Sequence, residues 1–299
     1  MKLAIILNGV SRKKRFFYSD ILPALKNQFA VEVFETQFSG HAIQIASSLT
    51  TYEYVLAAGG DGTLHQVLNG LLQNKNTELP TLGIIPLGTG NDFARTCGIF
   101  PDGNQITNLM IQNRTKQIDV GQITCVNDEG VRHSKYFINE CSLGMGPDVV
   151  RRLMSSNRSL GPSLTYLKAI VQTFFGLKPQ KVLVQTPGWK WSGKVRVLAV
   201  ANGKSFGNAI FIAPDAEQDD GFFSTFLAGD LSTLSFLICL QKLKGKTKVT
   251  NTLIHYNKCS HIEVTSPNPC PIEADGEWMG WLPMKVELLP KRIRFLNAI

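Results

Sequence analysis

The chain has 299 residues, of which 43% are hydrophobic and 18% are charged, so it is long enough for a large core and is neither disordered nor fibrous. It carries 31 basic and 23 acidic residues, and the excess lies after residue 120, where 21 basic residues face 14 acidic ones. This asymmetry fits a surface that meets phosphate or anionic lipid, and the alternative is an ordinary basic soluble protein.

Predicted strands and helices alternate in the first 90 residues. Buried apolar runs predict strands at residues 3–7, 31–34, 54–58 and 82–85. Apolar residues at helical spacing predict helices at residues 16–29, 42–49 and 64–72. This order predicts an α/β domain with a parallel sheet that is covered on both faces and binds ligands beyond the carboxyl ends of its strands.

After about residue 120 the pattern changes to strands without regular intervening helices. These predicted strands are residues 136–139, 181–185, 195–201, 222–227, 261–265 and 284–288. They favour a mainly antiparallel β-sandwich, interrupted by helices at residues 164–175 and 231–243. We expect an N-terminal domain over residues 1–122, to which residues 290–299 return, and a β-rich lipid-substrate domain over residues 123–289. The active site is expected in the cleft between them.

The cysteines and histidines indicate neither a zinc site nor a redox motif. The six cysteines form no C-x-x-C pair and the five histidines no H-x-x-x-H pair, so a reducing compartment is expected. The apolar run at residues 3–7 is too short for a signal peptide, and residues 234–240 fall short of the roughly 18 to 20 residues that span a bilayer. These features predict a cytoplasmic protein whose membrane contact is peripheral.

Two glycine-rich segments follow successive predicted strands. The first, Gly59-Gly60-Asp61-Gly62-Thr63, lies between an apolar strand and an apolar-faced helix. Such a turn lets a backbone approach phosphate at a helix N-terminus, and a tight turn capped by Thr63 is the alternative. The second reads P-L-G-T-G-N-D-F-A-R from residue 86, and both should face one crevice. Together they predict a nucleotide with its phosphates over residues 59–63, and with Thr89 and Asn91 as hydrogen-bonding side chains.

The two segments closely resemble the diacylglycerol kinase catalytic-domain family, which includes bacterial soluble lipid kinases and the sphingosine and ceramide kinases. The resemblance continues through Phe137-Ile138-Asn139, Ala201-Asn202-Gly203, Asp219-Asp220-Gly221 and Asp275-Gly276-Glu277. Asn8-Gly9-Val10-Ser11-Arg12 departs from the family's Asn-Pro-x-Ser-Gly loop, and Gly207-Asn208-Ala209 is a reduced glycine cluster. The resemblance implies a fold like that of NAD kinases and diacylglycerol kinases.

Phosphoryl transfer needs a metal to neutralise phosphate charge and a group that positions or deprotonates the attacking hydroxyl. The resemblance implies that Glu277, or less favourably Asp275, is the base, and that Asp61 works near the phosphates. It also implies a Mg²⁺ site made by the Asp220 carboxylate and the backbone oxygens of Glu217 and Phe222. The expected ATP-binding residues are Asn8, Thr36, Gly59, Gly60, Asp61, Gly62, Thr63, Leu64, Gly88, Thr89 and Asn91. Two histidines, His41 and His65, are expected on helix surfaces.

Two features suggest how a lipid is held. The apolar helix at residues 164–175 either lines a slot for lipid chains or packs in the core. Four lysines, Lys242, Lys244, Lys246 and Lys248, either contact anionic headgroups or form a solvated face.

The leading prediction is an ATP-dependent lipid kinase of the cytoplasm and inner membrane surface that most plausibly phosphorylates diacylglycerol to phosphatidic acid. One alternative is a NAD kinase, against which the intact P-L-G-T-G-N-D-F-A-R segment stands. Another is a non-catalytic lipid- or nucleotide-binding regulator, against which the retained Asp61, Asp220 and Glu277 stand. Nucleic-acid binding is not expected, because no RNP-like strand, zinc finger or helix-turn-helix accompanies the charge. The oligomeric state is open, with a homodimer among the options.

Overall fold

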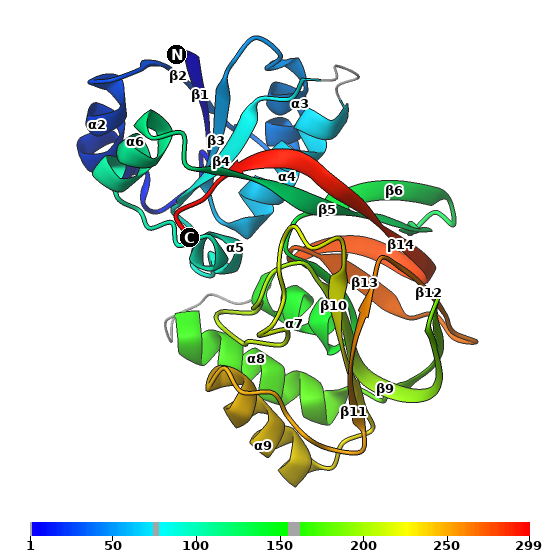
Figure 1. Cartoon of the computed structure of the whole chain (residues 1–299). Helices are drawn as coiled ribbons and strands as arrows, with labels where there is room; N and C mark the ends of the chain where they lie inside the picture. Colours follow the sequence, from blue (N-terminus) through cyan, green and yellow to red (C-terminus); the bar gives the residue numbers. More distant parts are fainter. Residues whose placement is uncertain (1, 74–77, 155–161) are drawn as a thin grey trace. The chain divides into compact units, whose positions relative to one another are not determined.

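The computed structural model describes residues 2–73, 78–154 and 162–299, and the chain divides into two compact units. Unit 1 comprises Met1–Val120 and Pro290–Ile299, and unit 2 comprises Gly121–Leu289. Two long strands, β5 (Thr115–Val126) and β14 (Glu277–Leu296), supply residues to both units (Figure 1). Each unit has its own sheet pattern and its own core.

Unit 1 is built on a parallel sheet with the strand order β14-β4-β3-β1-β2. Its strands β1 (Lys2–Leu7), β3 (Tyr54–Gly59) and β4 (Thr81–Pro86) are buried along nearly their whole length, whereas β2 (Ala30–Glu35) is an edge strand. Burial on both faces is what a covered parallel sheet requires. The α/β fold predicted for this part of the chain is confirmed.

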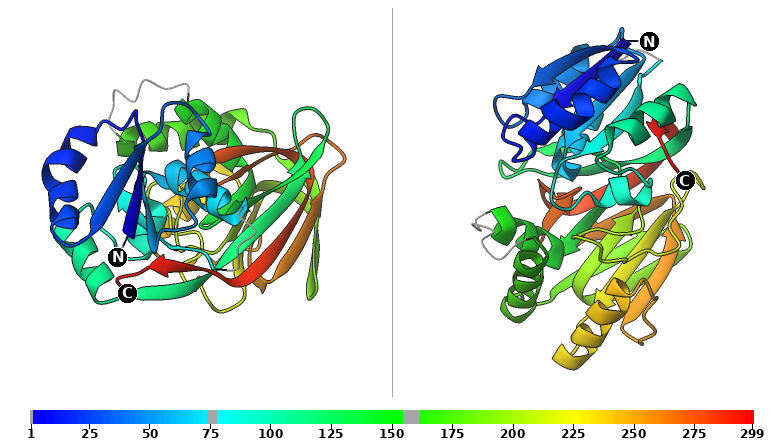
Figure 2. Two further views of the ribbon diagram at one scale, coloured as in Figure 1. Left: turned by 90° about the horizontal axis from the view of Figure 1, so that it is seen from above. Right: turned by 90° about the vertical axis from the view of Figure 1, so that its left-hand side faces the viewer.

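Helices cover both faces of this sheet. The helices that follow β2 and β3 are α3 (His41–Ser48) and α4 (Asp61–Gln73), and those that follow β4 are α5 (Asp92–Thr96) and α6 (Gly103–Ile111). The pair α3 and α4 lies on one face, and α2 (Leu22–Lys26) lies with α6 on the other (Figures 1 and 2). Because α4 and α5 begin directly after β3 and β4, both helix N-termini lie at the carboxyl edge of the sheet.

The single helix predicted over residues 16–29 is wrong. The segment is divided into α1 (Lys14–Phe16), a π-helical turn at Phe17–Ile21, and α2, which already ends at Lys26. Pro23 explains the difference, because proline donates no N–H to the preceding turn and helices adjust around it. The apolar positions Phe17, Ile21 and Leu25 are nevertheless buried.

Unit 2 is antiparallel, and six of its strands close on themselves. The order is β9 (Trp189–Ala201), β8 (Gln180–Thr186), β12 (His261–Thr265), β14, β13 (Pro271–Ala274) and β7 (Glu140–Gly144), which pairs back with β9. Strands β10 (Phe223–Gly229) and β11 (Ile254–Cys259) extend from β9, and β5 forms a hairpin with β6 (Arg132–Phe137). The predicted antiparallel β-sandwich class is confirmed.

Two apolar cores stabilise unit 2. One draws residues from the closed strands, among them Leu198, Ile262 and Val286. The other lies between β9, β10 and the helices α7 (Met145–Met154), α8 (Pro162–Gly176) and α9 (Thr233–Lys244). Phe174 of α8 stacks on Phe236 of α9, with ring centroids 3.9 Å apart. Two of these helices, α8 and α9, match the predicted ones, whereas α7 was not predicted.

No helix within the described ranges is both long and apolar enough to cross a membrane. All six cysteines lie in those ranges, all are buried, and none forms a disulfide.

Candidate functional site

The carboxyl ends of β1, β2 and β3 place polar side chains together in unit 1. Asn8 Nδ2 donates a hydrogen bond to Thr63 Oγ1 at 3.2 Å, and the N–H of Gly9 donates to Thr36 Oγ1 at 3.1 Å. A Cβ on Gly9 would lie 2.1 Å from the carbonyl oxygen of Thr36, so only glycine allows this approach. The structure therefore brings together Asn8, Thr36 and Thr63, which lie far apart in the sequence.

The two glycine-rich segments lie directly against one another. A Cβ on Gly88 would lie 2.5 Å from the Cα of Gly60, and one on Gly60 would lie 3.2 Å from the Cα of Gly88. The N–H groups of Leu87 and Gly88 both donate to the carbonyl of Gly59, at 2.8 and 3.1 Å. Backbone therefore packs on backbone here, and a side chain on Gly88 would force the two loops apart.

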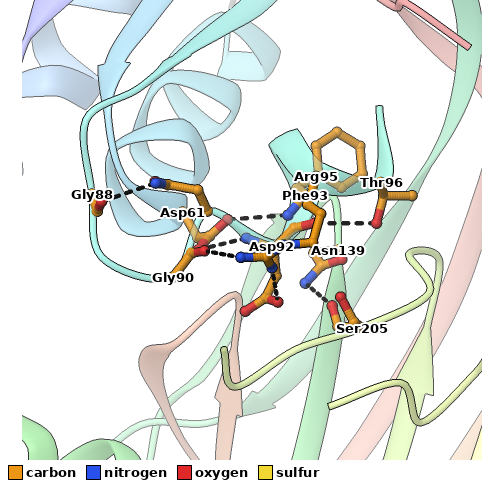
Figure 3. Close-up of polar contacts among 10 residues, drawn as sticks. Asp61, Gly88, Gly90, Asp92, Phe93, Arg95, Thr96, Asn139 and Ser205 are labelled. Carbon is orange, nitrogen blue, oxygen red and sulfur yellow. Dashed lines mark hydrogen bonds and ion pairs between the residues drawn. The ribbon is translucent and has the colours of Figure 1, made fainter. Parts of the chain in front are cut away.

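Asp61 joins the start of α4 to the start of α5. Its Oδ2 accepts a hydrogen bond from the N–H of Asp92 and its Oδ1 accepts one from Phe93, both at 3.3 Å (Figure 3). A carboxylate at a helix N-terminus is favoured by the exposed N–H groups. Asp61 thus has a structural role that sequence reasoning missed. Its predicted role near the phosphates stays a prediction.

Asn91, Thr89 and Leu64 are placed differently from one another. Asn91 has a left-handed backbone (φ 53°), and its Nδ2 donates to the carbonyl of Gly88 at 2.9 Å. Its Oδ1 is buried and accepts no hydrogen bond from the part of the chain that the structure describes. Thr89 is exposed, whereas the side chain of Leu64 is fully buried and its N–H donates to the carbonyl of Gly60 at 3.1 Å. Asn91 therefore offers a ligand an acceptor, and Leu64 closes the first turn of α4.

Asp92 and Arg95 lie in the second glycine-rich segment but were given no role from the sequence. Arg95 Nη1 pairs with Asp92 Oδ1 at 2.7 Å, and Arg95 Nη2 donates to the carbonyl of Gly90 at 3.0 Å (Figure 3). This guanidinium fixes the backbone of the loop from its outer side.

In unit 2, the carboxylate of Asp275 is held by three consecutive backbone N–H groups. Its Oδ1 accepts from Asn139 at 2.9 Å and from Glu140 at 3.1 Å, and its Oδ2 accepts from Ile138 at 3.0 Å. The side chain is only 5% exposed. Hydrogen bonds to a carboxylate are stronger than those between neutral groups, so Asp275 anchors the segment between β6 and β7.

The motif at residues 201–203 contacts the segment that Asp275 holds between β6 and β7. The N–H groups of Asn202 and Gly203 donate to the carbonyl of Asn139, at 2.8 and 2.9 Å, and Asn202 Nδ2 donates to the carbonyl of Ile138 at 2.9 Å. Asn139 Nδ2 in turn donates to the carbonyl of Ser205 at 3.1 Å (Figure 3). The motifs around residues 137–139, 201–203 and 275–277 therefore meet.

Asp275 and Gly276 form the two-residue turn of the β13–β14 hairpin. Their φ angles are +51° and +81°, and Ala274 pairs with Glu277 across the turn. Positive φ at both central residues is typical of a type I′ turn, which favours Asp-Gly. Since the Asp275 carboxylate is engaged with backbone N–H groups, the half-buried Glu277 is the better base of the two. That assignment stays a prediction.

Glu273, which sequence reasoning did not single out, is buried beside this turn. Ser142 Oγ donates to its Oε1, and the N–H of Gly276 donates to its Oε2 at 3.0 Å. Burial raises the pKa of Glu273 to about 7, and the hydrogen bonds offset only part of this effect. A single glutamate in the apolar run P-I-E-A was the only sequence signal for it.

The predicted metal loop contains a cation of the chain itself. Asp220 Oδ1 accepts from the N–H of Phe222 at 3.0 Å, and its Oδ2 pairs with Lys258 Nζ. This hydrogen bond raises the pKa of Lys258, and the charges of Asp220, Glu217 and Asp215 add to the effect. Among the described residues, no group of three or more His, Cys, Asp or Glu side chains could hold a metal. One carboxylate with the carbonyls of Glu217 and Phe222 still suits a hard cation, which would share Asp220 with Lys258.

The residues predicted to meet lipid are divided between core and surface. Ala169, Ile170 and Phe174 of α8 are buried in the second core of unit 2, as the core alternative predicts. The four lysines, Lys242, Lys244, Lys246 and Lys248, are exposed. A lipid slot along α8 stays a prediction.

The two helical histidines differ in their surroundings. His41 is half-buried and stacks on Phe38, with ring centroids 4.5 Å apart. His65 is buried at 3% exposure, so the expected surface position is wrong. Its helix α4 is covered on the side that carries His65, where Asn69 Nδ2 donates to its carbonyl at 2.8 Å.

Comparison with known proteins gives matches over nearly the whole chain. Residues 2–123 match the diacylglycerol kinase catalytic domain, and residues 141–297 match the YegS C-terminal NAD kinase beta sandwich-like domain. A diacylglycerol kinase of Staphylococcus saprophyticus is 30% identical over 287 residues, which cover 93% of this chain and 90% of the relative. A probable lipid kinase YegS-like protein of Yersinia enterocolitica is 28% identical over 299 residues, covering 97% and 95%.

Solved structures show the same fold. The crystal structure of a diacylglycerol kinase from Bacillus anthracis matches with a TM-score of 0.74 at 21% identity, covering 99% of this chain and 97% of that one. Yeast NADH kinase complexed with NADH matches with a TM-score of 0.52 at 12% identity, covering 99% and 74%. The family matches and the named relatives support a lipid kinase, a phosphotransferase with an alcohol group as acceptor, for which the family implies ATP as the donor. The chain belongs to the diacylglycerol kinase catalytic-domain family.

Proposed function

We propose that the protein is an ATP-dependent diacylglycerol kinase that forms phosphatidic acid. The observation that carries the proposal is the contact between Gly60 and Gly88, which aligns two glycine-rich loops at the carboxyl edge of a parallel sheet. The first loop leads into the N-terminus of α4, a setting that favours phosphate, and the second leads into α5, whose first N–H groups are held by Asp61. Relatives named diacylglycerol kinase support the choice of acceptor.

In this proposal unit 1 holds the nucleotide. The absence of a Cβ at Gly60 and Gly88 lets the two loops pack together, and the phosphates bind along their backbone at the start of α4. The buried Oδ1 of Asn91 accepts a hydrogen bond from a donor group of the nucleotide. Asn8 and Thr36 hold the neighbouring loop in place through Thr63 and Gly9.

Unit 2 supplies the base. The carboxylate of Glu277 takes the proton of the lipid hydroxyl while that oxygen forms a bond to the γ-phosphorus. The bond between the γ-phosphorus and the bridging oxygen breaks, and ADP leaves with that oxygen. Asp275 positions Glu277, because its three hydrogen bonds to backbone N–H groups fix the turn that precedes it.

We further propose that Mg²⁺ is required. When bound, it neutralises charge on the phosphates. Asp220 and the carbonyl oxygens of Glu217 and Phe222 would hold it in unit 2, beside Lys258. The NAD kinase alternative has a shared G-G-D-G turn and the likeness of fold in its favour, and the P-L-G-T-G-N-D-F-A-R segment stands against it.

The test is incubation with labelled ATP, with and without Mg²⁺, against diacylglycerol, sphingosine, ceramide and NAD. We expect labelled phosphatidic acid, formed only with Mg²⁺. Labelled NADP, or label on a different lipid only, would refute the proposed acceptor. The variant Glu277→Gln should lower turnover by about 10²- to 10⁴-fold with unchanged ATP affinity. Glu263→Gln, which changes an exposed glutamate on β12, is the matched control.

A further inference from the structure

Helix α9 is apolar on two opposite faces. Phe236, Cys239, Leu240 and Leu243 point into the second core of unit 2. On the other face, Leu234, Leu237 and Ile238 are 69%, 48% and 45% exposed, and their spacing places them in one stripe. A helix that borders water normally has polar residues on its outer face, so an apolar outer stripe indicates a second apolar partner.

The end of α8 extends this apolar surface. Phe175 is 67% exposed, and the preceding Phe174 stacks on Phe236 of α9. Helices α8 and α9 lie next to each other in Figure 1. Arg196 connects the same two helix ends, because it donates to the carbonyl of Phe174 at 3.1 Å and pairs with Asp230 at 3.0 Å, just before α9 begins. We name Phe175, Leu234, Leu237 and Ile238 the α8–α9 apolar patch.

The segments that carry the patch are rich in basic residues, and two acids that border these segments in the sequence, Asp230 and Asp215, are paired with Arg196 and Lys248. Residues 231–262, which contain α9, include five lysines and no Asp or Glu. Residues 149–214, which contain α8, include ten Lys and Arg and again no Asp or Glu. An apolar stripe bordered by an excess of lysines is typical of a segment that lies on an anionic lipid surface.

A polar cavity adjoins the end of α8. It has a volume of about 320 Å³ and is lined by Asp148, Arg151, Arg152, Thr173, Gly176 and Leu177. Thr173 is 1% exposed, and its Oγ1 has no hydrogen-bond partner in the part of the chain that the structure describes. The lining carries both signs of charge, and Arg151 also lies over the ring of Trp278 at 5.0 Å; Gly176 and Leu177 directly follow the exposed Phe175, so the cavity borders the patch with polar groups.

We propose that the α8–α9 apolar patch docks on a leaflet that contains anionic phospholipid. The four apolar side chains enter the acyl region, and the lysines in the last turn of α9 and directly after it contact headgroup phosphates. The inference deepens the proposed function and rests on it in one respect, namely that a kinase whose acceptor is a bilayer lipid must reach the bilayer.

The test is sedimentation of the full chain with vesicles of phosphatidylcholine alone or mixed with phosphatidylglycerol. The variant Leu234→Gln/Leu237→Gln/Ile238→Gln should bind the mixed vesicles on the order of 100-fold more weakly. The control Phe100→Gln/Ile111→Gln/Val131→Gln removes three equally exposed apolar side chains elsewhere and should bind like the unaltered protein. Unchanged binding of the α9 variant, or equal losses in both variants, overturns the proposal.

Charge is tested by replacing Lys242, Lys244, Lys246 and Lys248 with glutamine. Each lysine should contribute about 5-fold to the preference for anionic vesicles, and physiological salt should reduce that preference. Analytical ultracentrifugation distinguishes a second copy of the chain as the occupant. A dimer that the α9 variant converts to a monomer overturns the lipid proposal.

Activity on a monomeric short-chain diacylglycerol without vesicles separates this inference from the proposed function. We expect the α9 variant to keep this activity while it loses vesicle binding. If the unaltered protein phosphorylates no diacylglycerol but binds vesicles through the patch, the proposed function fails and the docking surface stands.

Discussion

Replacing Asp275 by asparagine should destabilise unit 2 strongly, although the change removes only a charge and one acceptor. The carboxylate accepts two N–H groups at Oδ1 and one at Oδ2. If the asparagine side-chain oxygen keeps the two hydrogen bonds from the N–H groups of Asn139 and Glu140, its NH₂ group faces the N–H of Ile138. Two donors then face each other and the third hydrogen bond is lost. One lost bond to a charged acceptor costs about 1.5 to 3 kcal/mol, and two weakened bonds cost about 1 kcal/mol each, so we expect about 3 to 5 kcal/mol in all.

The tryptophans allow the stability of unit 2 to be measured separately from that of unit 1. All four, Trp189, Trp191, Trp278 and Trp281, belong to unit 2, so tryptophan fluorescence during urea titration follows that unit alone. The midpoint for Asp275→Asn should fall well below that of the unaltered protein. Glu277→Gln is the control and should change the unfolding free energy by less than about 1 kcal/mol. Equal midpoints for Asp275→Asn and the unaltered protein would falsify the anchoring role of Asp275.

Three further outcomes are expected. Gly88→Ala should lower the unfolding free energy by about 1 to 3 kcal/mol and weaken ATP binding in calorimetry, because its Cβ would lie 2.5 Å from the Cα of Gly60. Unchanged ATP affinity would show that the two loops do not form the nucleotide site. Burial raises the pKa of Glu273 to about 7, so the folded state holds this proton more tightly than the unfolded state, and stability is lost as pH rises from about 4.5 to about 7. The Glu273→Gln variant should lack this loss of unfolding free energy, which is about 3 kcal/mol in the unaltered protein. The reasoning is contradicted if the urea midpoints of the variant and of the unaltered protein change with pH in the same way between pH 5 and pH 8. Burial raises the pKa of the thiols to about 11 in Cys125, Cys239 and Cys270 and to about 12 in Cys259. These buried cysteines should therefore react with a thiol reagent only after urea is added, and rapid reaction of the native protein would show that they are accessible.

The parallel sheet of unit 1 could be predicted from the sequence because β1, β3 and β4 are buried on both faces. Their residues are almost all apolar, so each strand is visible as an uninterrupted run. In unit 2, β8 and β9 alternate between more and less buried residues over part of their length and are longer than predicted, whereas the nearly fully buried strands β7 and β13 were not predicted. Only residues 284–288 of β14 were expected, because Gly280 and Pro283 interrupt the alternation before them.

Part of the candidate site, the pair of glycine-rich loops in unit 1, could also be predicted from the sequence. The contact between Gly60 and Gly88 follows from the rule that successive parallel strands end at one edge, and the sequence places a glycine-rich segment after each. The partners of Asp275 could not be foreseen. They are backbone N–H groups more than 130 residues earlier in the chain, and backbone groups leave no trace in residue types.

The turn at Asp275-Gly276 also bears on how the protein ages. Among the dipeptides that begin with aspartate, Asp-Gly is the most prone to cyclise, because the glycine nitrogen can attack the aspartate carboxyl carbon and leave isoaspartate. Here that carboxylate is held by three N–H groups, and the N–H of Gly276 is engaged by Glu273. Asp61-Gly62 and Asp102-Gly103 are constrained at helix starts, whereas Asp220-Gly221 lies in a loop outside helices and strands. Of the four Asp-Gly pairs in the chain, the one in the loop proposed to hold the metal should therefore accumulate isoaspartate first in stored protein.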